Sequence, residues 1–224
     1  MRIMYPDLID TVEIIDSNVI GIVIENQQLM SGFIQDLYSQ VNGFDGKTVL
    51  SEDNKPIEIA KNLEVINEYF NFDINKKTIV NKIIKRISET VLAGESYGDT
   101  MLFLGNIEQK LYNWGFEVPG DIIFNSITPE ILLKAAGLGI NNDYSSLNEI
   151  AEKLLDYMEL VKEYDRKKVF VFVNMRSFFS DKIMQQFINS CISHNHSVIL
   201  VDNKDNPVLK KENRIIIDVD LCKF

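Results

Sequence analysis

The stretch RKKVFVFVN at residues 166–174 and the stretch VILVD at residues 198–202 decide the fold class of this chain. Both are apolar at consecutive positions, which is typical of strands in sheets that are covered on both faces. The residues between them have the length and pattern of a helix. We therefore predict a β-α-β unit with parallel strands, joined by a right-handed crossover, and an α/β fold.

The β-α-β unit places Asn174 and Asp202 near the carboxyl edge of the sheet, where open α/β folds bind ligands. Asp202 follows an apolar strand, as a magnesium-binding aspartate does in nucleotide enzymes. The stretch GFDGKT at 43–48, however, has two residues between its glycines where a Walker A loop has four, and it follows a predicted helix. We expect no bound nucleotide.

Histidine and cysteine residues do not form a recognisable catalytic or metal-binding pattern. His194 and His196 lie between a predicted helix and a strand, close to Cys191. That position favours a helix C-terminal cap over a metal ligand. The sequence also shows no ordering of Ser, His and Asp residues that would indicate a hydrolytic site. We therefore expect a binding protein rather than an enzyme.

The two cysteines and the hydropathy indicate the cellular setting. Cys191 and Cys222 suggest neither a disulfide framework nor a zinc site. No apolar run approaches the ~18 residues that a membrane span needs, and the N-terminus lacks a signal pattern. We expect a cytoplasmic protein with no membrane partner.

Basic side chains are concentrated in two segments of an otherwise acidic chain. The net charge is −10, yet residues 73–86 carry five basic and one acidic side chains, and residues 166–224 carry ten and six. A polyanion responds to the local field rather than to the total charge. The two segments are compatible with a confined DNA-binding surface, and also with lysines on solvated helix faces.

The N-terminal part of the chain has the pattern of a half-buried sheet. Strands are predicted at 12–15, 19–24 and 47–50, with a helix at 27–41. From residue 73 the spacing becomes helical, because isoleucine or valine recurs every fourth residue from Ile79 to Val91.

That helix has a basic exposed side, formed by Lys82, Lys85 and Arg86. Further helices are predicted at 97–114, 129–136 and 147–164. We expect residues 73–163 to form a helical domain inserted into a discontinuous α/β domain made of residues 1–72 and 164–224.

Three short patterns occur in the order and approximate spacing of a known family. They are FDIN at 72–75 with Thr78 and Ile79, LLK at 132–134 with Gly137, and KKVFVFVN at 167–174. Together they resemble the small CRISPR adaptation protein special to type II-A systems. The resemblance covers nearly the whole chain and rests on the order of the patterns around the helical insertion.

The resemblance implies a degenerate head like that of P-loop kinases, without their nucleotide motifs, and an inserted all-helical leg domain. It implies a homotetrameric ring that holds double-stranded DNA ends in a positive channel through phosphate contacts, without reading base sequence. It further implies a part in spacer acquisition, and so in antiviral defence, beside the adaptation integrase and the RNA-guided effector nuclease, with no nuclease role of its own.

Candidate phosphate contacts come from the basic helix and from lysines that match the family. They are Lys76, Lys77, Lys82, Lys85 and Arg86 in the helical segment 73–86, and Lys134, Lys167 and Lys168 at matching positions.

The family's ring depends on calcium, and here this chain departs from the family. In place of a dense acidic stretch before the helix at 129–136 it has Glu117, Asp121 and Asn125. Calcium takes six to eight oxygen ligands, so these three would need carbonyls, water or a neighbouring subunit. We expect weaker calcium dependence, with packing across the ring interface in its place.

Two other classes of function remain open. One is a divergent nucleotide-dependent kinase or regulatory ATPase that uses the edge at Asn174 and Asp202, which the missing phosphate loop disfavours. The other is an interaction module whose acidic surface meets a basic protein, which the two basic segments disfavour.

Overall fold

The computed structural model describes residues 1–6, 11–15, 19–144 and 146–223. The chain divides into two compact units, Met1–Ile74 with Asp143–Phe224, and Asn75–Asn142. We call the first the α/β unit and the second the helical unit.

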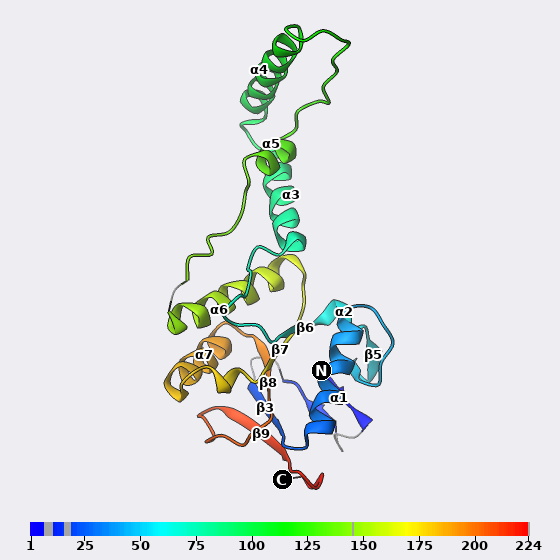
Figure 1. Ribbon diagram of the computed structural model, residues 1–224, viewed down its shortest axis with the longest axis vertical. Coiled ribbons are helices and arrows are strands. Elements are labelled where there is room, and N and C mark those ends of the chain that lie inside the picture. Colours follow the sequence, from blue (N-terminus) through cyan, green and yellow to red (C-terminus); the bar gives the residue numbers. More distant parts are fainter. Residues whose placement is uncertain (7–10, 16–18, 145, 224) are drawn as a thin grey trace. The chain divides into compact units, whose positions relative to one another are not determined.

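A five-stranded parallel sheet forms the centre of the α/β unit (Figure 1). The strand order is β6-β7-β8-β3-β9, and every neighbouring pair is parallel. The strands are β3 (Val19–Ile24), β6 (Leu63–Ile66), β7 (Val169–Val173), β8 (Ser197–Asp202) and β9 (Glu212–Ile217). Every residue of β3, β6, β7 and β8 is buried, as expected for a sheet covered on both faces. The α/β class and the β-α-β unit are confirmed.

Helices cover both faces of this sheet. Phe33 and Leu37 of α1 (Gln27–Val41) share one core with Val171, whereas Phe172 turns to the other face and meets Phe187 of α7 (Asp181–Ser193) at a ring distance of 5.2 Å. Helix α6 (Leu147–Tyr164) packs beside α7. Consecutive apolar residues in β7 therefore supply two separate cores. The unit also contains the short helix α2 (Ile59–Asn62) and the 3-10 helix η2 (Met175–Ser177).

A smaller antiparallel sheet lies in the N-terminal part, with the order β2-β1-β4-β5. Its strands are β1 (Arg2–Met4), β2 (Val12–Glu13), β4 (Val49–Glu52) and β5 (Lys55–Ile57). Asp53 and Asn54 join β4 to β5 with φ angles of 51° and 62°, the left-handed pair that a tight hairpin requires.

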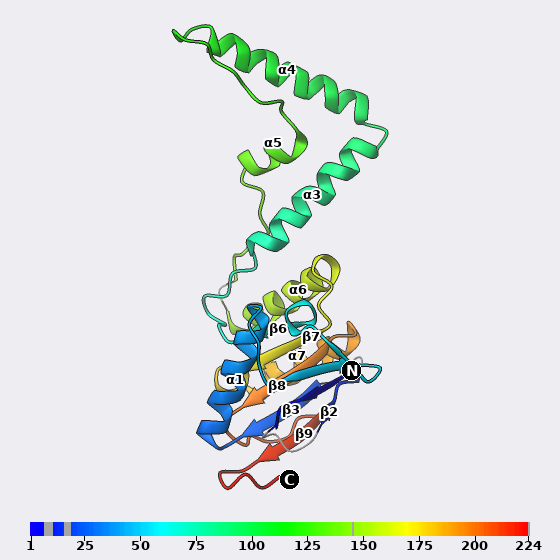
Figure 2. The same cartoon turned by 90° about the vertical axis from the view of Figure 1, so that its right-hand side faces the viewer.

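The helical unit consists of α3 (Lys77–Ala93), α4 (Tyr97–Gly115) and α5 (Pro129–Ala135). Helices α3 and α4 meet in a V, and α5 packs on α3 (Figure 2). The side chain of Asn75 bonds both backbone groups of Ile140, at 2.9 Å to the carbonyl and 2.6 Å from the N–H. These two hydrogen bonds join the start of the helical unit to its end. No helix among the described residues is both long and apolar enough to cross a membrane.

The boundaries of the two units differ from the expected domain limits of 72/73 and 163/164. Helix α6, which we expected in the inserted domain, buries Leu154 and Met158 and packs with the α/β unit. Its Tyr157 hydroxyl donates to Glu64 of β6 at 2.7 Å. An apolar stripe in the sequence shows that a helix packs against another part of the protein, but it does not show which part.

Candidate functional site

Among the residues that the structure describes, the carboxyl edge of the parallel sheet carries no phosphate loop. Strand β3 reaches α1 through Glu25 and Asn26, neither of which is a glycine. The Asn26 side chain accepts hydrogen bonds from the backbone N–H groups of Gln28 at 3.1 Å and Leu29 at 3.0 Å. These are N–H groups of the kind that bind anions at a helix N-terminus, and here the cap engages them.

Asn174 and Asp202 lie together at this edge, as the β-α-β unit predicts. Asn174 has a φ of 53° and accepts at Oδ1 from the Asn203 N–H at 3.1 Å. Asp202 is 5% exposed, and its burial raises the pKa to about 6 although Arg176 opposes the shift. Asp202 is therefore part of the interior rather than a group presented to a ligand.

The glycine-containing stretch 43–48 binds a carboxylate of the chain itself. Asp36 accepts from the backbone N–H groups of Lys47 at 2.7 Å and Thr48 at 2.8 Å. Burial alone would raise the pKa of Asp36, but these bonds and one from the Thr48 hydroxyl lower it. The backbone N–H groups that would bind a phosphate in a phosphate loop here bond Asp36, and they attach the stretch 43–48 to α1.

The two histidines belong to a helix end and to the core. His194 caps α7, with Nδ1 2.9 Å from the Ser190 carbonyl. His196 is 1% exposed, and its Nε2 lies 2.9 Å from Glu159 Oε1 without the alignment of a hydrogen bond. Burial lowers the pKa of His196, and Glu159 opposes this. Within the described ranges, no group of three or more His, Cys, Asp or Glu residues is placed to hold a metal ion.

Helix α3 presents three cations on one face. Lys82, Lys85 and Arg86 are all exposed, while Ile79 and Ile84 of the apolar side are buried. Lys85 Nζ lies 3.8 Å from Glu89, and an exposed pair of this kind contributes little to stability. The three side chains of this face are exposed to solvent, where an anion can approach them.

The other candidates of the helical unit lie in more mixed surroundings. Lys76 is the half-buried N-cap residue of α3, and Lys77 is exposed in its first turn. Lys134 on α5 pairs with Glu130 at 2.7 Å, and this bond lowers the pKa of Glu130. An anion that approaches Lys134 must compete with that carboxylate.

Lys167 and Lys168 belong to the α/β unit and differ from one another. Lys167 pairs with Glu64 of β6, and these two side chains are 14% and 9% exposed. Glu64 also accepts from Tyr157, so Lys167 completes a nearly buried network. Lys168 pairs with Glu52 at 2.7 Å on the surface. The adjacent lysines thus differ in their surroundings: Lys167 belongs to a nearly buried network, and Lys168 lies on the surface.

The expected calcium ligands do not form a site that fits the ion. Glu117, Asp121 and Asn125 are exposed along the irregular segment between α4 and α5. They supply two carboxylates and one amide, whereas calcium takes six to eight oxygens. The residues present in one chain do not fit calcium.

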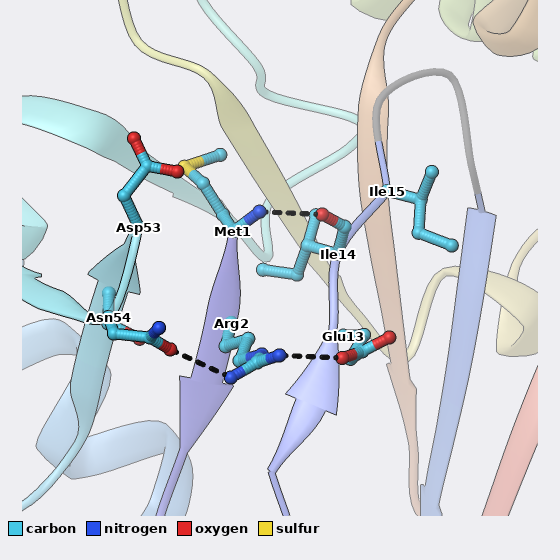
Figure 3. Close-up of a pocket in the computed structure, with 8 residues that line it drawn as sticks. Met1, Arg2, Glu13, Ile14, Ile15, Asp53 and Asn54 are labelled. Atoms are coloured by element: carbon cyan, nitrogen blue, oxygen red, sulfur yellow. Dashed lines mark hydrogen bonds and ion pairs between the residues drawn. The ribbon is translucent and has the colours of Figure 1, made fainter.

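A polar cavity of about 440 Å³ opens beside the small sheet (Figure 3). Figure 3 shows Arg2 between Asn54 and Glu13, at 2.9 and 3.1 Å. The N-terminal amine of Met1 donates to the Ile14 carbonyl at 3.0 Å. Because these groups bond one another, we assign no chemistry to this cavity.

The helical unit exposes a large apolar surface that the sequence interpretation missed. Of the residues of α4, only Leu104 is buried. Phe103, Trp114 and Phe116 are 58%, 63% and 85% exposed. The full set of exposed large apolar residues from α4 to residue 123 is Tyr97, Met101, Leu102, Phe103, Tyr112, Trp114, Phe116, Val118, Ile122 and Ile123. In the sequence, apolar side chains around most of the circumference of α4 could have indicated this exposed surface. Large apolar residues that are exposed in one part of a chain in this way are typical of protein interfaces.

Comparison with known proteins gives one family and a distant structural likeness. The family model for the CRISPR-associated protein Cas_Csn2 matches residues 38–221. None of the curated proteins compared matches the chain. Similar solved structures include an ABC transporter ATP-binding protein from Pyrococcus furiosus, 10% identical over 92% of this chain and 88% of that chain, with a TM-score of 0.41. Another is an ATP-binding cassette in its ADP conformation, 11% identical over 88% and 74%, with a TM-score of 0.42. At these scores the likeness supports no conclusion.

Proposed function

This chain belongs to the CRISPR-associated Csn2 family of type II-A adaptation, and from that premise we propose that it binds double-stranded DNA ends as a ring, independently of sequence. Its role is to support spacer acquisition in the cytoplasm beside the adaptation integrase and the RNA-guided effector nuclease. In this proposal the α/β unit is a degenerate P-loop-kinase-like head and the inserted helical unit is the leg.

The observation that carries DNA binding is the exposed basic face of α3. Lys85 and Arg86 are neighbours that lie one turn after Lys82, and all three are exposed to solvent. Cations in such a row bind successive phosphates and release counterions, which gives affinity without base discrimination. The whole chain has a net charge of −10, so its acidic remainder repels DNA elsewhere and confines it to this face.

We propose a binding role without catalysis or bound nucleotide. Two features support it. Asn26 caps the helix that would hold a nucleotide phosphate, and Asp36 occupies the amides of the 43–48 stretch. In both places, a side chain of the protein accepts hydrogen bonds from backbone N–H groups that could otherwise bind a phosphate.

We further propose a homotetramer. The exposed apolar side chains of α4 and the segment after it support self-association, because a surface of this kind is costly to leave in water. Ring closure by apolar packing also accounts for a weak need for calcium.

The decisive experiment is a gel shift of linear and closed circular duplex at several salt concentrations. The parent protein binds linear duplex of any sequence and not the circle. Replacement of Lys82, Lys85 and Arg86 together by Glu abolishes binding while circular dichroism and oligomer mass stay unchanged. Where residual affinity is measurable, the slope of log K against log salt falls by about 0.9 for each phosphate that the protein no longer neutralises.

A matched control separates this face from the total charge. Replacement of Lys55, Lys204 and Lys210 by Glu makes the same charge change at exposed positions of the α/β unit. If the α3 face rather than the total charge holds the DNA, this variant should bind within about twofold of the parent, since charges more than a Debye length from the phosphates are screened. If the α3 variant binds linear duplex as tightly as the parent, or if the control loses as much affinity, α3 is not the DNA surface.

A further inference from the structure

A basic pocket lies at the amino-terminal edge of the parallel sheet, opposite the edge where ligands were expected. Its volume is about 560 Å³, and its walls come from the ends of α6 and β4 and the starts of β7 and β8. Four cations line it, Lys162, Arg166, Lys167 and Lys168, against one carboxylate, Glu52. All of these belong to the α/β unit, so the pocket is contained in one compact body.

Two of the four cations are not matched by a carboxylate. Lys167 and Lys168 pair with Glu64 and Glu52. Lys162 Nζ instead donates to the backbone carbonyls of His194 and Asn195, at 2.9 and 3.3 Å, and pairs with no carboxylate among the described residues. Arg166 is exposed and makes no ion pair or hydrogen bond with the residues that the structure describes. Its guanidinium is therefore open to an anion.

The backbone at Arg166 makes arginine an unexpected residue there. Its φ is 59°, directly after the C-cap Asp165 of α6. Helix termination explains this left-handed conformation, but glycine is the residue that adopts it without strain. Glycine can therefore replace Arg166 without straining the backbone.

The inner wall of the pocket strengthens the attraction for an anion. Phe170 and His196 are each 1% exposed, with ring centroids 5.7 Å apart. Because both rings are buried, water is excluded from this wall, and charges at its rim act more strongly than on an open surface.

We propose that this pocket binds a phosphate group, with the Arg166 guanidinium as its main ligand and Lys162 as a second cation. A guanidinium forms two parallel hydrogen bonds to phosphate oxygens. The pocket has room for a phosphate with a further group attached, either a small phosphate compound or the terminal phosphate of a duplex. The site does not depend on the DNA surface of α3.

The test uses pyrophosphate as the probe and calorimetry as the measurement. The full-length parent binds it with a measurable dissociation constant at low salt, and Arg166→Gly weakens binding about tenfold or more, as expected when a charged hydrogen-bonding group is removed. Because glycine suits the backbone, Arg166→Gly should not lower the thermal unfolding midpoint. Weaker binding by this variant therefore does not come from unfolding.

Lys211→Gly is the matched control. Lys211 is also exposed and left-handed, with a φ of 68°, and it lies outside the pocket. Its replacement removes the same charge and the same strain and should leave pyrophosphate binding unchanged. No binding by the parent, equal binding by Arg166→Gly, or an equal weakening in Lys211→Gly overturns the proposal.

A second arm identifies the source of the phosphate. Linear duplexes with 5′-phosphate and 5′-hydroxyl ends are compared in the parent and in Arg166→Gly. A preference for 5′-phosphate that Arg166→Gly removes, alongside pyrophosphate binding, supports the DNA terminus as the ligand. Pyrophosphate binding without such a preference supports a small phosphate compound. The α3 variant loses duplex binding with either end and keeps pyrophosphate binding, so failure of the DNA proposal is distinguishable from failure of this one.

Discussion

Lys167 and Lys168 are adjacent in the sequence but differ in the free energy that their ion pairs contribute. Lys167 neutralises Glu64 in a nearly buried network with Tyr157, while Lys168 meets Glu52 at the surface. We expect Lys167→Ala to lower the free energy of unfolding by about 3 kcal/mol, because a carboxylate is left buried without its cation. Lys168→Ala should change it little, because solvent screens that pair.

Urea denaturation of the two variants checks this expectation. Equal small effects would show that Glu64 finds water or another partner when Lys167 is removed. The result also matters for the DNA proposal. Weaker DNA binding by a Lys167 variant is informative only after its folding has been verified.

Asp202 is a second residue whose surroundings predict a measurable effect, in this case one that depends on pH. Burial raises the pKa of Asp202 from 3.8 to about 6, so the folded state favours the protonated carboxyl. The stability of the folded state relative to the unfolded state is therefore greatest below pH 3.8, and this advantage is lost as pH rises through about 6. Asp202→Asn removes the cost of ionising a buried carboxyl. We expect a gain of about 3 kcal/mol in unfolding free energy at pH 8 and about half of that at pH 5. A gain independent of pH, measured by urea denaturation at both values, would contradict the assignment.

At the scale of elements, local signals predicted most of the fold. Helices α1 and α6 match the expected ranges 27–41 and 147–164, since caps and apolar periodicity are encoded within the helix itself. Ser146 and Glu149 form the capping box that the sequence indicates. Strand β9 was missed because it lies at the edge of the sheet and is only partly buried, so it lacks the continuous apolar run of β7.

Interactions that span long sequence separations could not be predicted in the same way. The basic face of α3 is visible in the sequence because residues three and four apart share a helix face. The bond between Lys167 and Glu64 joins residues 103 apart, and the pocket around Arg166 combines residues near 52, 166 and 196. A positive φ at an arginine is likewise set by the helix end rather than by the residue type.

At the scale of the whole molecule, the main feature is apolar surface concentrated in the helical unit. Phe103 and Trp114 line one side of α4 and are 58% and 63% exposed. A shared cavity of about 390 Å³ along that side would accept apolar side chains of a second copy. We therefore predict a homotetramer at micromolar concentration, measured by light scattering or native mass spectrometry.

Calcium should have only a weak influence on this assembly. Glu117, Asp121 and Asn125 provide few of the oxygens that the ion requires, so a chelator should leave the mass largely unchanged. Complete dissociation by chelator that calcium reverses would show that the ligand set is completed across subunits, and apolar packing would then be insufficient.

Phe103→Asp combined with Trp114→Asp tests where the assembly energy lies. Both side chains are already exposed in one chain, so the change should leave the fold intact, as circular dichroism can verify. In the oligomer they are expected to be buried, and a carboxylate there is strongly unfavourable, so the double variant should fall to a smaller species. Val208→Asp with Val219→Asp is the matched control, since these residues of the α/β unit are 65% and 63% exposed. If the helical-unit variant stays tetrameric, or the parent is a monomer, the apolar surface of α4 does not hold the ring together.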